Sequence, residues 1–206
     1  MVYQLITAFA LMLTPVNASA STDTDSIDCN TEQTTMLIPP PPAKPSGTAF
    51  IVISKRDLTL RVYDRDENGD TVIVAQYPCC MGKNKGNKQK RGDMRTPESP
   101  AGKPFKITMI QDASTWRHDF KDGRGNIKAY GHWFLRLATP GHSGIGIHGS
   151  TNNAKSVPGR ASEGCIRLLD EDIILLKKHF AYVGMPVIIL GEEQPPLEWE
   201  RRAWQK

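Results

Sequence analysis

A cysteine and a histidine lie in two glycine-rich segments in the second half of the chain. Cys165 belongs to the segment Ser162–Arg167 (SEGCIR), and His148 precedes Gly149 in the sequence Ile-His-Gly-Ser. Cysteine attacks carbonyl carbons as its thiolate, and an imidazole is the usual base that takes the thiol proton. Glycines beside both residues let the backbone approach a reacting group and leave N–H groups for a developing oxyanion. The pattern predicts a cysteine nucleophile with its histidine, and therefore an acyl-transfer enzyme.

Zinc chemistry is the main alternative, because the chain has four cysteines and five histidines. Zinc sites usually show paired ligands, as in Cys-x-x-Cys or His-Glu-x-x-His, and the sequence has neither spacing. We therefore expect no metal and no cofactor. Cys29, Cys79 and Cys80 stay unassigned. In an oxidising compartment Cys29 can pair with either of the other two, which as neighbours point to opposite faces of a strand.

The first 46 residues do not resemble part of a folded domain. Residues 1–20 combine a short apolar run with Ala18-Ser19-Ala20, which is typical of a cleaved export signal, and no Lys or Arg precedes the run. The run is shorter than the roughly 20 residues that span a bilayer. Residues 21–46 are rich in Ser, Thr, Asp and Pro and predict a disordered tether. We expect an exported protein of the periplasm or cell envelope, with no transmembrane segment after signal cleavage.

The rest of the chain is dominated by β-strand patterns. Asn68-Gly69 predicts a hairpin turn, and one helix is expected from Asp170 to about Tyr182, with acidic residues at its start and basic residues at its end. Together these elements predict a mainly β sandwich or barrel with one late helix. Short apolar or alternating runs predict the strands at 50–53, 58–63, 71–77, 106–110, 133–137, 144–148 and 186–190.

The charge pattern argues against a nucleic-acid partner. The formal net charge is +4, and basic residues concentrate at positions 83, 85, 88, 90 and 91. No aromatic residue is interleaved with them, as stacking on bases requires. We interpret this segment as a solvated loop, in a protein whose mild basicity also suits an anionic polymer or a carboxylate-bearing substrate.

Three ordered motifs resemble those of the L,D-transpeptidase catalytic domain, also called the YkuD type, of bacterial cell-wall enzymes. They are the Gly92–Glu98 segment (GDMRTPE), the strand end Ile145–Gly149, and Ser-x-Gly-Cys-x-Arg, whose cysteine follows the histidine by 17 positions. The resemblance implies a YkuD-like β fold and a catalytic domain at residues 47–192. Residues 193–206 would then form a C-terminal tail.

The resemblance also implies roles for residues around the thiol. The Gly149 carbonyl would orient His148, and backbone N–H groups around Gly164 and Cys165 would meet the oxyanion. Arg167 could bind a substrate carboxylate with its planar fork. The full set of residues expected to contact substrate is Arg167, Ser162 and His132.

One position departs from the commonest form of the family motif. Glu163 stands where many members have a histidine. A carboxylate that faced Cys165 would oppose thiolate formation and raise the pKa of the thiol. We therefore expect Glu163 to point away from Cys165, toward a basic loop.

The substrate that the resemblance implies is a peptidoglycan stem peptide. Cys165 would release a terminal D-alanine, keep the acyl part as a thioester and pass it to an amine of another stem, which forms a 3-3 crosslink. Water as acceptor would make the protein an L,D-carboxypeptidase, and an amine of an envelope protein would make it an anchoring enzyme. A non-catalytic wall-binding module with the same fold is the alternative from another class.

Overall fold

The computed structural model describes residues 40–205 of the chain. The expected export signal at 1–20, residues 21–39 of the expected tether and Cys29 lie outside the described residues. Within residues 40–205, no helix combines the length and apolar character needed to cross a membrane.

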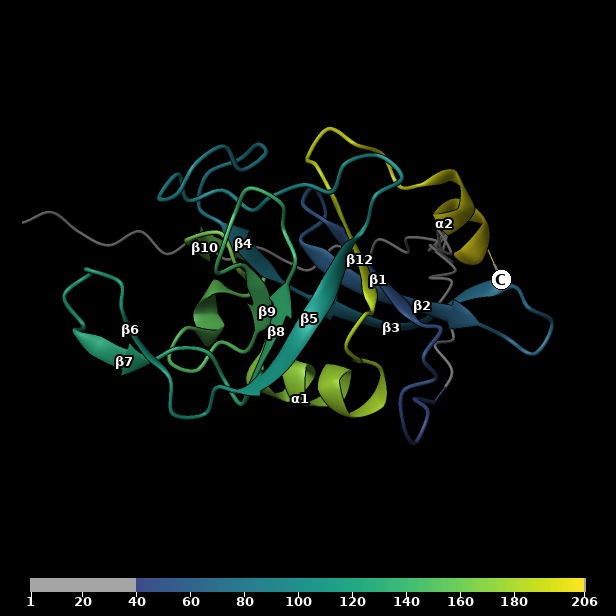
Figure 1. Ribbon diagram of the computed structural model, residues 1–206, viewed down its shortest axis with the longest axis horizontal. Helices are drawn as coiled ribbons and strands as arrows, with labels where there is room; N and C mark the ends of the chain where they lie inside the picture. The colour runs from purple at the N-terminus through teal and green to yellow at the C-terminus, as the bar shows by residue number, and fades with distance from the viewer. Residues whose placement is uncertain (1–39, 206) are drawn as a thin grey trace, which may run out of the picture. The chain divides into compact units, whose positions relative to one another are not determined.

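Ten strands form one sheet, in the order β10-β4-β11-β9-β8-β5-β12-β1-β2-β3, and two more form a separate hairpin (Figure 1). The architecture is mainly β, as the sequence predicts. The helices are α1 (Asp170–His179) and α2 (Glu198–Ala203), with a 3-10 turn at Ala154–Ser156. In chain order the strands are β1 (Phe50–Ser54), β2 (Thr59–Arg65), β3 (Thr71–Pro78), β4 (Cys80–Gly82), β5 (Phe105–Asp112), β6 (Arg117–Asp119), β7 (Asn126–Lys128), β8 (Trp133–Leu137), β9 (Gly146–His148), β10 (Gly159–Ser162), β11 (Ile166–Arg167) and β12 (Pro186–Leu190).

The strand that comes last in the chain, β12, lies inside the sheet between β5 and β1. β1, β2 and β3 form an antiparallel meander, and the expected turn at Gly69 (φ +80°) joins β2 to β3. β12 then pairs in parallel with β1 and antiparallel with β5. Val187 and Ile189 join the main apolar core, whereas Ile188 packs against a second apolar cluster. The continuous apolar sequence of β12 is explained by this burial of both faces.

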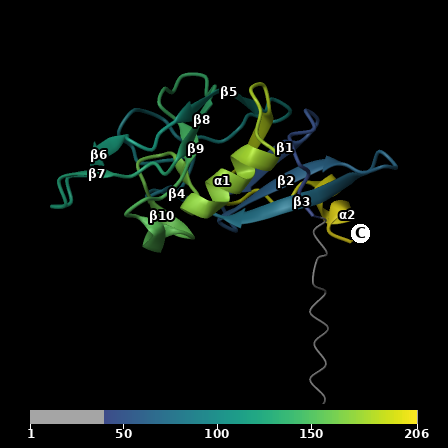
Figure 2. The same cartoon turned by 90° about the horizontal axis from the view of Figure 1, so that it is seen from below.

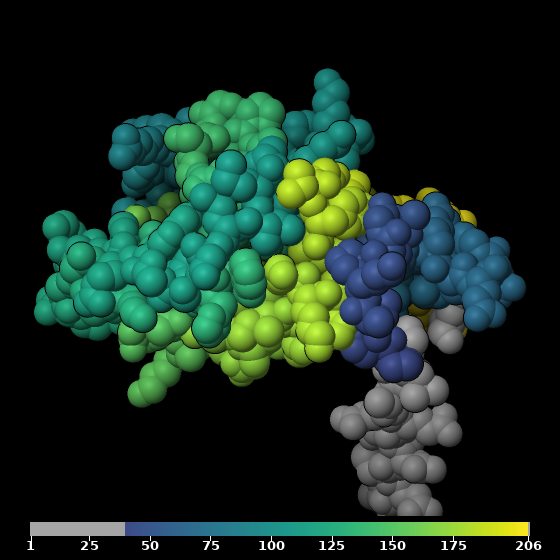
Figure 3. All heavy atoms as spheres, turned by 60° about the horizontal axis from the view of Figure 1, so that its bottom comes forward, coloured from purple at the N-terminus to yellow at the C-terminus, as the bar shows by residue number. Residues whose placement is uncertain are grey.

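Helix α1 packs against one face of the sheet (Figure 2). Ile173 and Leu176 are fully buried in the main core. Acidic residues fill the first turn and basic residues the last, which the helix dipole favours. The helix ends at His179, slightly before the predicted end, because Phe180 leaves the helical conformation (φ −130°). The first described residues run beside α1 (Figure 3), where His179 Nδ1 donates a hydrogen bond to the Pro42 carbonyl at 2.6 Å.

The segment that the sequence predicts as a tail contains a second short helix, α2, which packs onto the β1–β3 part of the sheet. Glu200 is fully buried and accepts a hydrogen bond from the Tyr63 hydroxyl at 2.7 Å. The Trp204 indole donates to the same hydroxyl at 3.0 Å, and the Trp199 ring packs against Phe50 and Tyr63. Burial of aromatic surface and a satisfied buried carboxylate stabilise this contact.

A buried lysine ties the segment 83–98, which we call the 83–98 loop, to the sheet. Lys55 is fully buried just after β1, and its Nζ lies 2.6 Å from Glu98 Oε1 and 3.3 Å from Glu192 Oε2. It also donates to the carbonyls of Gly86 at 2.8 Å and Thr96 at 3.3 Å. A buried charge is tolerated only when it is paired in this way, so the network fixes both ends of the loop.

A Lys55→Met substitution should destabilise the fold strongly, because it leaves two carboxylates without their buried cation. We expect the free energy of unfolding to fall by about 3–5 kcal/mol, the usual loss when one partner of a buried pair is removed. Urea denaturation measures this change. Lys121→Met is the matched control, since Lys121 is exposed and its pair with Asp119 lies in solvent. Similar losses in the two variants would contradict the role of Lys55.

Candidate active site

Two adjacent parallel strands bring the predicted cysteine and histidine together. β9 and β11 pair with Ile147 opposite Ile166 and His148 opposite Arg167. Side chains alternate between the faces of a sheet, so His148 and Arg167 share one face. Cys165 comes directly before β11, two residues from Arg167, and is placed on the same face. The spacing of 17 positions from His148 to Cys165 thus brings the two onto neighbouring parallel strands.

A tight turn holds the thiol. The Ser162 hydroxyl donates to the Cys165 carbonyl at 2.6 Å and accepts the Gly164 N–H at 3.1 Å. Gly164 has φ +134°, and a Cβ there would lie 2.7 Å from the Arg95 carbonyl oxygen, so only glycine fits. Ser162 is thus bonded to the backbone of the turn on both sides and positions Cys165.

The Cys165 thiol is protonated in the resting site. Cys165 is half-buried, and its Sγ donates to the Gly144 carbonyl at 3.3 Å. Burial raises the pKa of the thiol, and this outweighs the opposite effects of the Gly146 N–H and the Arg167 guanidinium. A base is therefore needed to generate the nucleophile.

His148 is a buried, neutral imidazole with a fixed orientation. It is 3% exposed, and its Nδ1 lies 2.7 Å from the Gly149 carbonyl, the partner that the resemblance implied. Burial lowers the pKa of His148 to about 3, although the bond to Gly149 favours the charged form. Nδ1 carries the proton in this bond, so Nε2 is the free basic nitrogen.

Gly149 has no room for a side chain. A Cβ there would lie 2.8 Å from the Gly131 Cα and would clash with Asp170 Oδ1. The Gly149 N–H donates to the Tyr130 carbonyl at 2.8 Å, and Asp170 Oδ1 accepts the Ser150 N–H at 2.7 Å. These contacts hold the Gly149 carbonyl against the imidazole. The Gly149 N–H is bound to Tyr130 and is therefore not free to bind an oxyanion.

Two aromatic side chains that were not predicted from the sequence as part of the site hold the imidazole in place. Phe134 stacks on His148 with ring centroids 5.6 Å apart, and Tyr130 packs on it at 4.8 Å. Phe134 lies opposite His148 in the β8–β9 pair. The strand around Phe134 is predictable from its apolar pattern. Its pairing with the histidine strand is a long-range contact that no local signal reveals.

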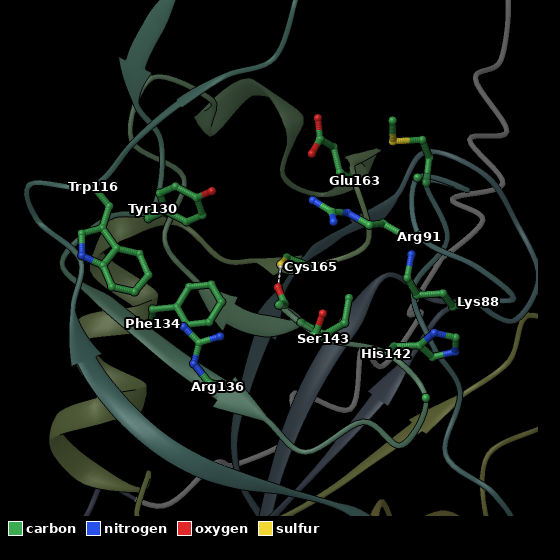
Figure 4. Close-up of a pocket in the computed structure, with 15 residues that line it drawn as sticks. Lys88, Arg91, Trp116, Tyr130, Phe134, Arg136, His142, Ser143, Glu163 and Cys165 are labelled. Carbon is green, nitrogen blue, oxygen red and sulfur yellow. Dashed lines mark hydrogen bonds between the residues drawn. The ribbon is translucent and has the colours of Figure 1, made fainter.

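Cys165 opens into a cleft of about 580 Å³ (Figure 4). One wall is aromatic and consists of Trp116, Tyr130 and Phe134. The opposite wall is formed by the 83–98 loop, with Lys88 and Arg91. Around the thiol, the cleft thus has an apolar side and a cationic side. The other lining residues are Gly92, Met94, Arg136, Gly141, His142, Ser143, Gly144, Ile145 and Glu163.

Arg167 lines a neighbouring cavity of about 320 Å³. It is 4% exposed, and its guanidinium lies over the Phe120 ring at 5.0 Å and 3.4 Å from the Ser156 hydroxyl. Its Nε is buried without a hydrogen-bond partner among residues 40–205. Glu163 lines both this cavity and the Cys165 cleft.

The positions of His132 and Glu163 differ from those expected, namely His132 at the substrate and Glu163 turned away from Cys165 toward a basic loop. His132 is exposed and lines neither cavity. Glu163 pairs with His118 of β6, with 3.3 Å between Oε1 and Nε2, instead of with a basic loop. Glu163 also borders the cleft that holds Cys165, where its charge contributes to the raised pKa of the thiol. The β6–β7 hairpin is thereby joined to the cysteine turn.

The Gly92–Glu98 segment (GDMRTPE) shapes the 83–98 loop. Asp93 accepts the Lys88 ammonium at 2.8 Å and the N–H groups of Gln89, Lys90 and Arg95. Desolvation opposes ionisation of Asp93, but these bonds hold its pKa well below the usual range. The fully buried Thr96 hydroxyl accepts the Gly82 N–H at 2.8 Å. The motif therefore builds the cationic wall of the cleft.

The other cysteines of the described chain are inert. Cys79 and Cys80 are fully buried free thiols, and burial raises the pKa of Cys79. Cys165 is the only one of the three described thiols that reaches solvent. Among residues 40–205 no group of His, Cys, Asp or Glu side chains is arranged to hold a metal ion.

A thiol and an oriented neutral base beside an open cleft are the requirements of cysteine acyl transfer. Residues 48–189 match the YkuD family model, the L,D-transpeptidase catalytic domain. This match covers more than half of the chain, which therefore belongs to that family. A comparison with curated protein sequences gave no significant match.

Solved structures with the same fold are similar at low identity. Bd1075 from Bdellovibrio bacteriovorus is 21% identical, with a TM-score of 0.50 over 80% of this chain and 58% of that chain. The helical cell shape determining protein Pgp2 from Campylobacter jejuni is 20% identical, with a TM-score of 0.49 over 76% and 52%. An L,D-transpeptidase from Mycobacterium smegmatis is 21% identical, with a TM-score of 0.46 over 69% and 58%. The likeness to Bd1075 shows the fold alone. The chain spans only 52–58% of the length of these three proteins.

The depressed pKa of His148 predicts a loss of stability in acid. In the unfolded chain the imidazole gains a proton near pH 6.5, whereas in the fold it stays neutral down to about pH 3. The unfolded state binds more protons across this window, so stability falls as the pH falls. For His148→Gln we expect the loss between pH 7 and pH 4 to shrink by up to about 3 kcal/mol.

Urea denaturation at both pH values measures this difference. His132→Gln is the control, because His132 is exposed and should leave the pH dependence as in the parent protein. An unchanged pH dependence in His148→Gln would show that the buried imidazole is not neutral.

Proposed function

We propose that the protein is a cell-wall L,D-transpeptidase that forms a thioester between Cys165 and a peptidoglycan tetrapeptide stem. The observation that supports this most directly is the neutral His148 imidazole, fixed through Nδ1 on the Gly149 carbonyl, on the strand beside Cys165. Its family and its open cleft agree with this chemistry. The activity needs no cofactor.

In the first half-reaction, Cys165 Sγ attacks the carbonyl carbon that precedes the terminal D-alanine. His148 Nε2 takes the thiol proton as the S–C bond forms, and backbone N–H groups around Gly164 and Cys165 meet the oxyanion. Because Gly164 donates its N–H to Ser162, the N–H of Cys165 is the better placed donor. The C–N bond then breaks, and His148 returns the proton to the leaving amine of D-alanine.

In the second half-reaction, an acceptor amine attacks the thioester carbonyl. His148 takes a proton from the attacking nitrogen, the C–S bond breaks, and the proton returns to the departing sulfur. An amine of a second stem gives a 3-3 crosslink. Attack by water would make the protein an L,D-carboxypeptidase, and attack by an amine of an envelope protein would anchor that protein to the wall. The acceptor therefore determines the class of reaction.

Arg167 is proposed to bind a substrate carboxylate from the neighbouring cavity. It lines that cavity, and its Nε has no partner in the described part of the chain. Charged hydrogen bonds to a carboxylate would satisfy it. Ser162 is proposed to have no direct contact with the substrate and to act by holding the turn 162–165 that carries Cys165. We place the protein, after export, in the periplasm or cell envelope, where stem peptides occur.

Incubation with purified tetrapeptide stems should add to the protein the mass of a stem that has lost D-alanine. Intact-protein mass spectrometry detects this adduct. Cys165→Ala should give none, and His148→Gln should form it about 10²–10⁴-fold more slowly, because general base catalysis is lost. Cys29→Ser is the matched control, since it removes a different thiol, and should acylate like the parent protein.

The muropeptides released in the same reaction distinguish a transpeptidase, a carboxypeptidase and a non-catalytic binding module. Crosslinked dimers indicate a transpeptidase, whereas trimmed monomers alone indicate a carboxypeptidase. Acylation of Cys165→Ala would overturn the nucleophile. Stem binding with no adduct on any variant would identify a non-catalytic wall-binding module.

A further inference from the structure

The charges that line the Cys165 cleft are not balanced. The ionised side chains on its walls are the cations Lys88, Arg91 and Arg136 and the carboxylate Glu163. Lys88 is neutralised by its ion pair with Asp93 at 2.8 Å. Glu163 lies 3.3 Å from the His118 imidazole, which is no permanent cation. Two arginines and one carboxylate therefore remain without a permanent counter-ion, and the balance at the cleft is positive.

The two arginines differ in how many of their N–H donors already have a hydrogen-bond partner. Arg136 binds the Gln111 side-chain oxygen with Nε at 3.1 Å and Nη2 at 3.0 Å, and lies over the Phe134 ring at 5.2 Å. Arg91 is exposed and makes no hydrogen bond or ion pair with any other residue of the part 40–205. In Figure 4 its side chain points into the cleft, toward the middle of the lining residues. Its whole guanidinium fork is available to a ligand.

The backbone that carries Arg91 is held in place, unlike that of an ordinary solvated loop. The Asp93 carboxylate collects the Lys88 ammonium and three backbone N–H groups from residues on both sides of Arg91. The buried Lys55 holds the Gly86 carbonyl at 2.8 Å and Glu98 at 2.6 Å. A free planar fork on a fixed base binds a carboxylate with two parallel hydrogen bonds and loses little entropy.

We propose that Arg91 is a specificity-determining residue that binds a carboxylate of the donor peptide. This inference rests on the proposed function. The aromatic wall of Trp116, Tyr130 and Phe134 carries one cation, Arg136, whose guanidinium is already bound to the Gln111 side chain. A donor carboxylate therefore lies on the 83–98 side of Cys165, which orients the scissile carbonyl over the thiol. Two groups of a donor have this chemistry: the terminal carboxylate of the leaving residue, and a side-chain carboxylate on the third residue.

Three synthetic tetrapeptides test the proposal: one with both carboxylates free, one amidated at the terminus, and one amidated at the third residue. The rate of adduct formation is measured by intact-protein mass spectrometry for the parent protein, Arg91→Gln and Lys90→Gln. In the parent protein, amidation at the recognised position should slow acylation by about 10- to 100-fold, as the loss of a charged hydrogen bond does. The position at which amidation slows acylation shows whether Arg91 binds the terminal carboxylate or the side-chain carboxylate of the third residue.

Arg91→Gln should slow acylation by the free donor by the same factor and should no longer distinguish free from amidated donors. Lys90→Gln makes the same charge change on an exposed neighbour that does not line the cleft, and should keep the discrimination. Equal slowing of all three donors by Arg91→Gln, or discrimination that survives it, would overturn the inference while leaving the proposed function intact.

If no donor acylates the parent protein, the proposed function fails and the inference is tested by binding. Equilibrium affinities of the three peptides are then measured on Cys165→Ala, with and without Arg91→Gln. Weaker binding of an amidated peptide that disappears with Arg91→Gln supports the carboxylate contact. Equal affinities for all peptides contradict it.

Discussion

The hydrogen bond between His148 Nδ1 and the Gly149 carbonyl is the contact on which the rest of the site depends. It replaces the carboxylate that usually orients a catalytic histidine, and a carbonyl can do this without adding a charge. The imidazole stays neutral because burial beside Phe134 and Tyr130 lowers its pKa more than the bond to Gly149 raises it. Burial also raises the pKa of the Cys165 thiol, so in the proposed mechanism a thiolate–imidazolium pair would form only when substrate is bound.

The cleft has a rigid frame on both sides of the thiol. On one side, aromatic rings pack on one another and on the histidine. On the other side, the buried charges of Lys55 and Asp93 organise the 83–98 loop. The sequence shared with the family at Gly92–Glu98 serves this second purpose. These residues act through the shape of the wall, whereas Arg91, which lies between them, remains free for a ligand.

Local patterns predicted α1 and the longer strands, because each has an apolar period or run of its own. They did not predict β4, β6, β7, β10 and β11, which have two to four residues each and are defined by their partners. The pairing of Phe134 with His148 and the contact of Glu163 with His118 could not be predicted, since strand register and loop packing are set by tertiary contacts and leave no local signal. Helix α2 was missed for a similar reason. Its six residues have no apolar period of their own, and it is stabilised by contacts to the distant Tyr63.

The central place of β12 makes the fold dependent on the end of the chain. Pro186–Leu190 lies between β1 and β5, so each of these strands lacks one of its two neighbours until residue 190 is present. Such long-range pairing slows folding and postpones closure of the sheet until synthesis is nearly complete. A nascent chain that stops short of this strand exposes two open sheet edges, which are surfaces that chaperones and proteases recognise.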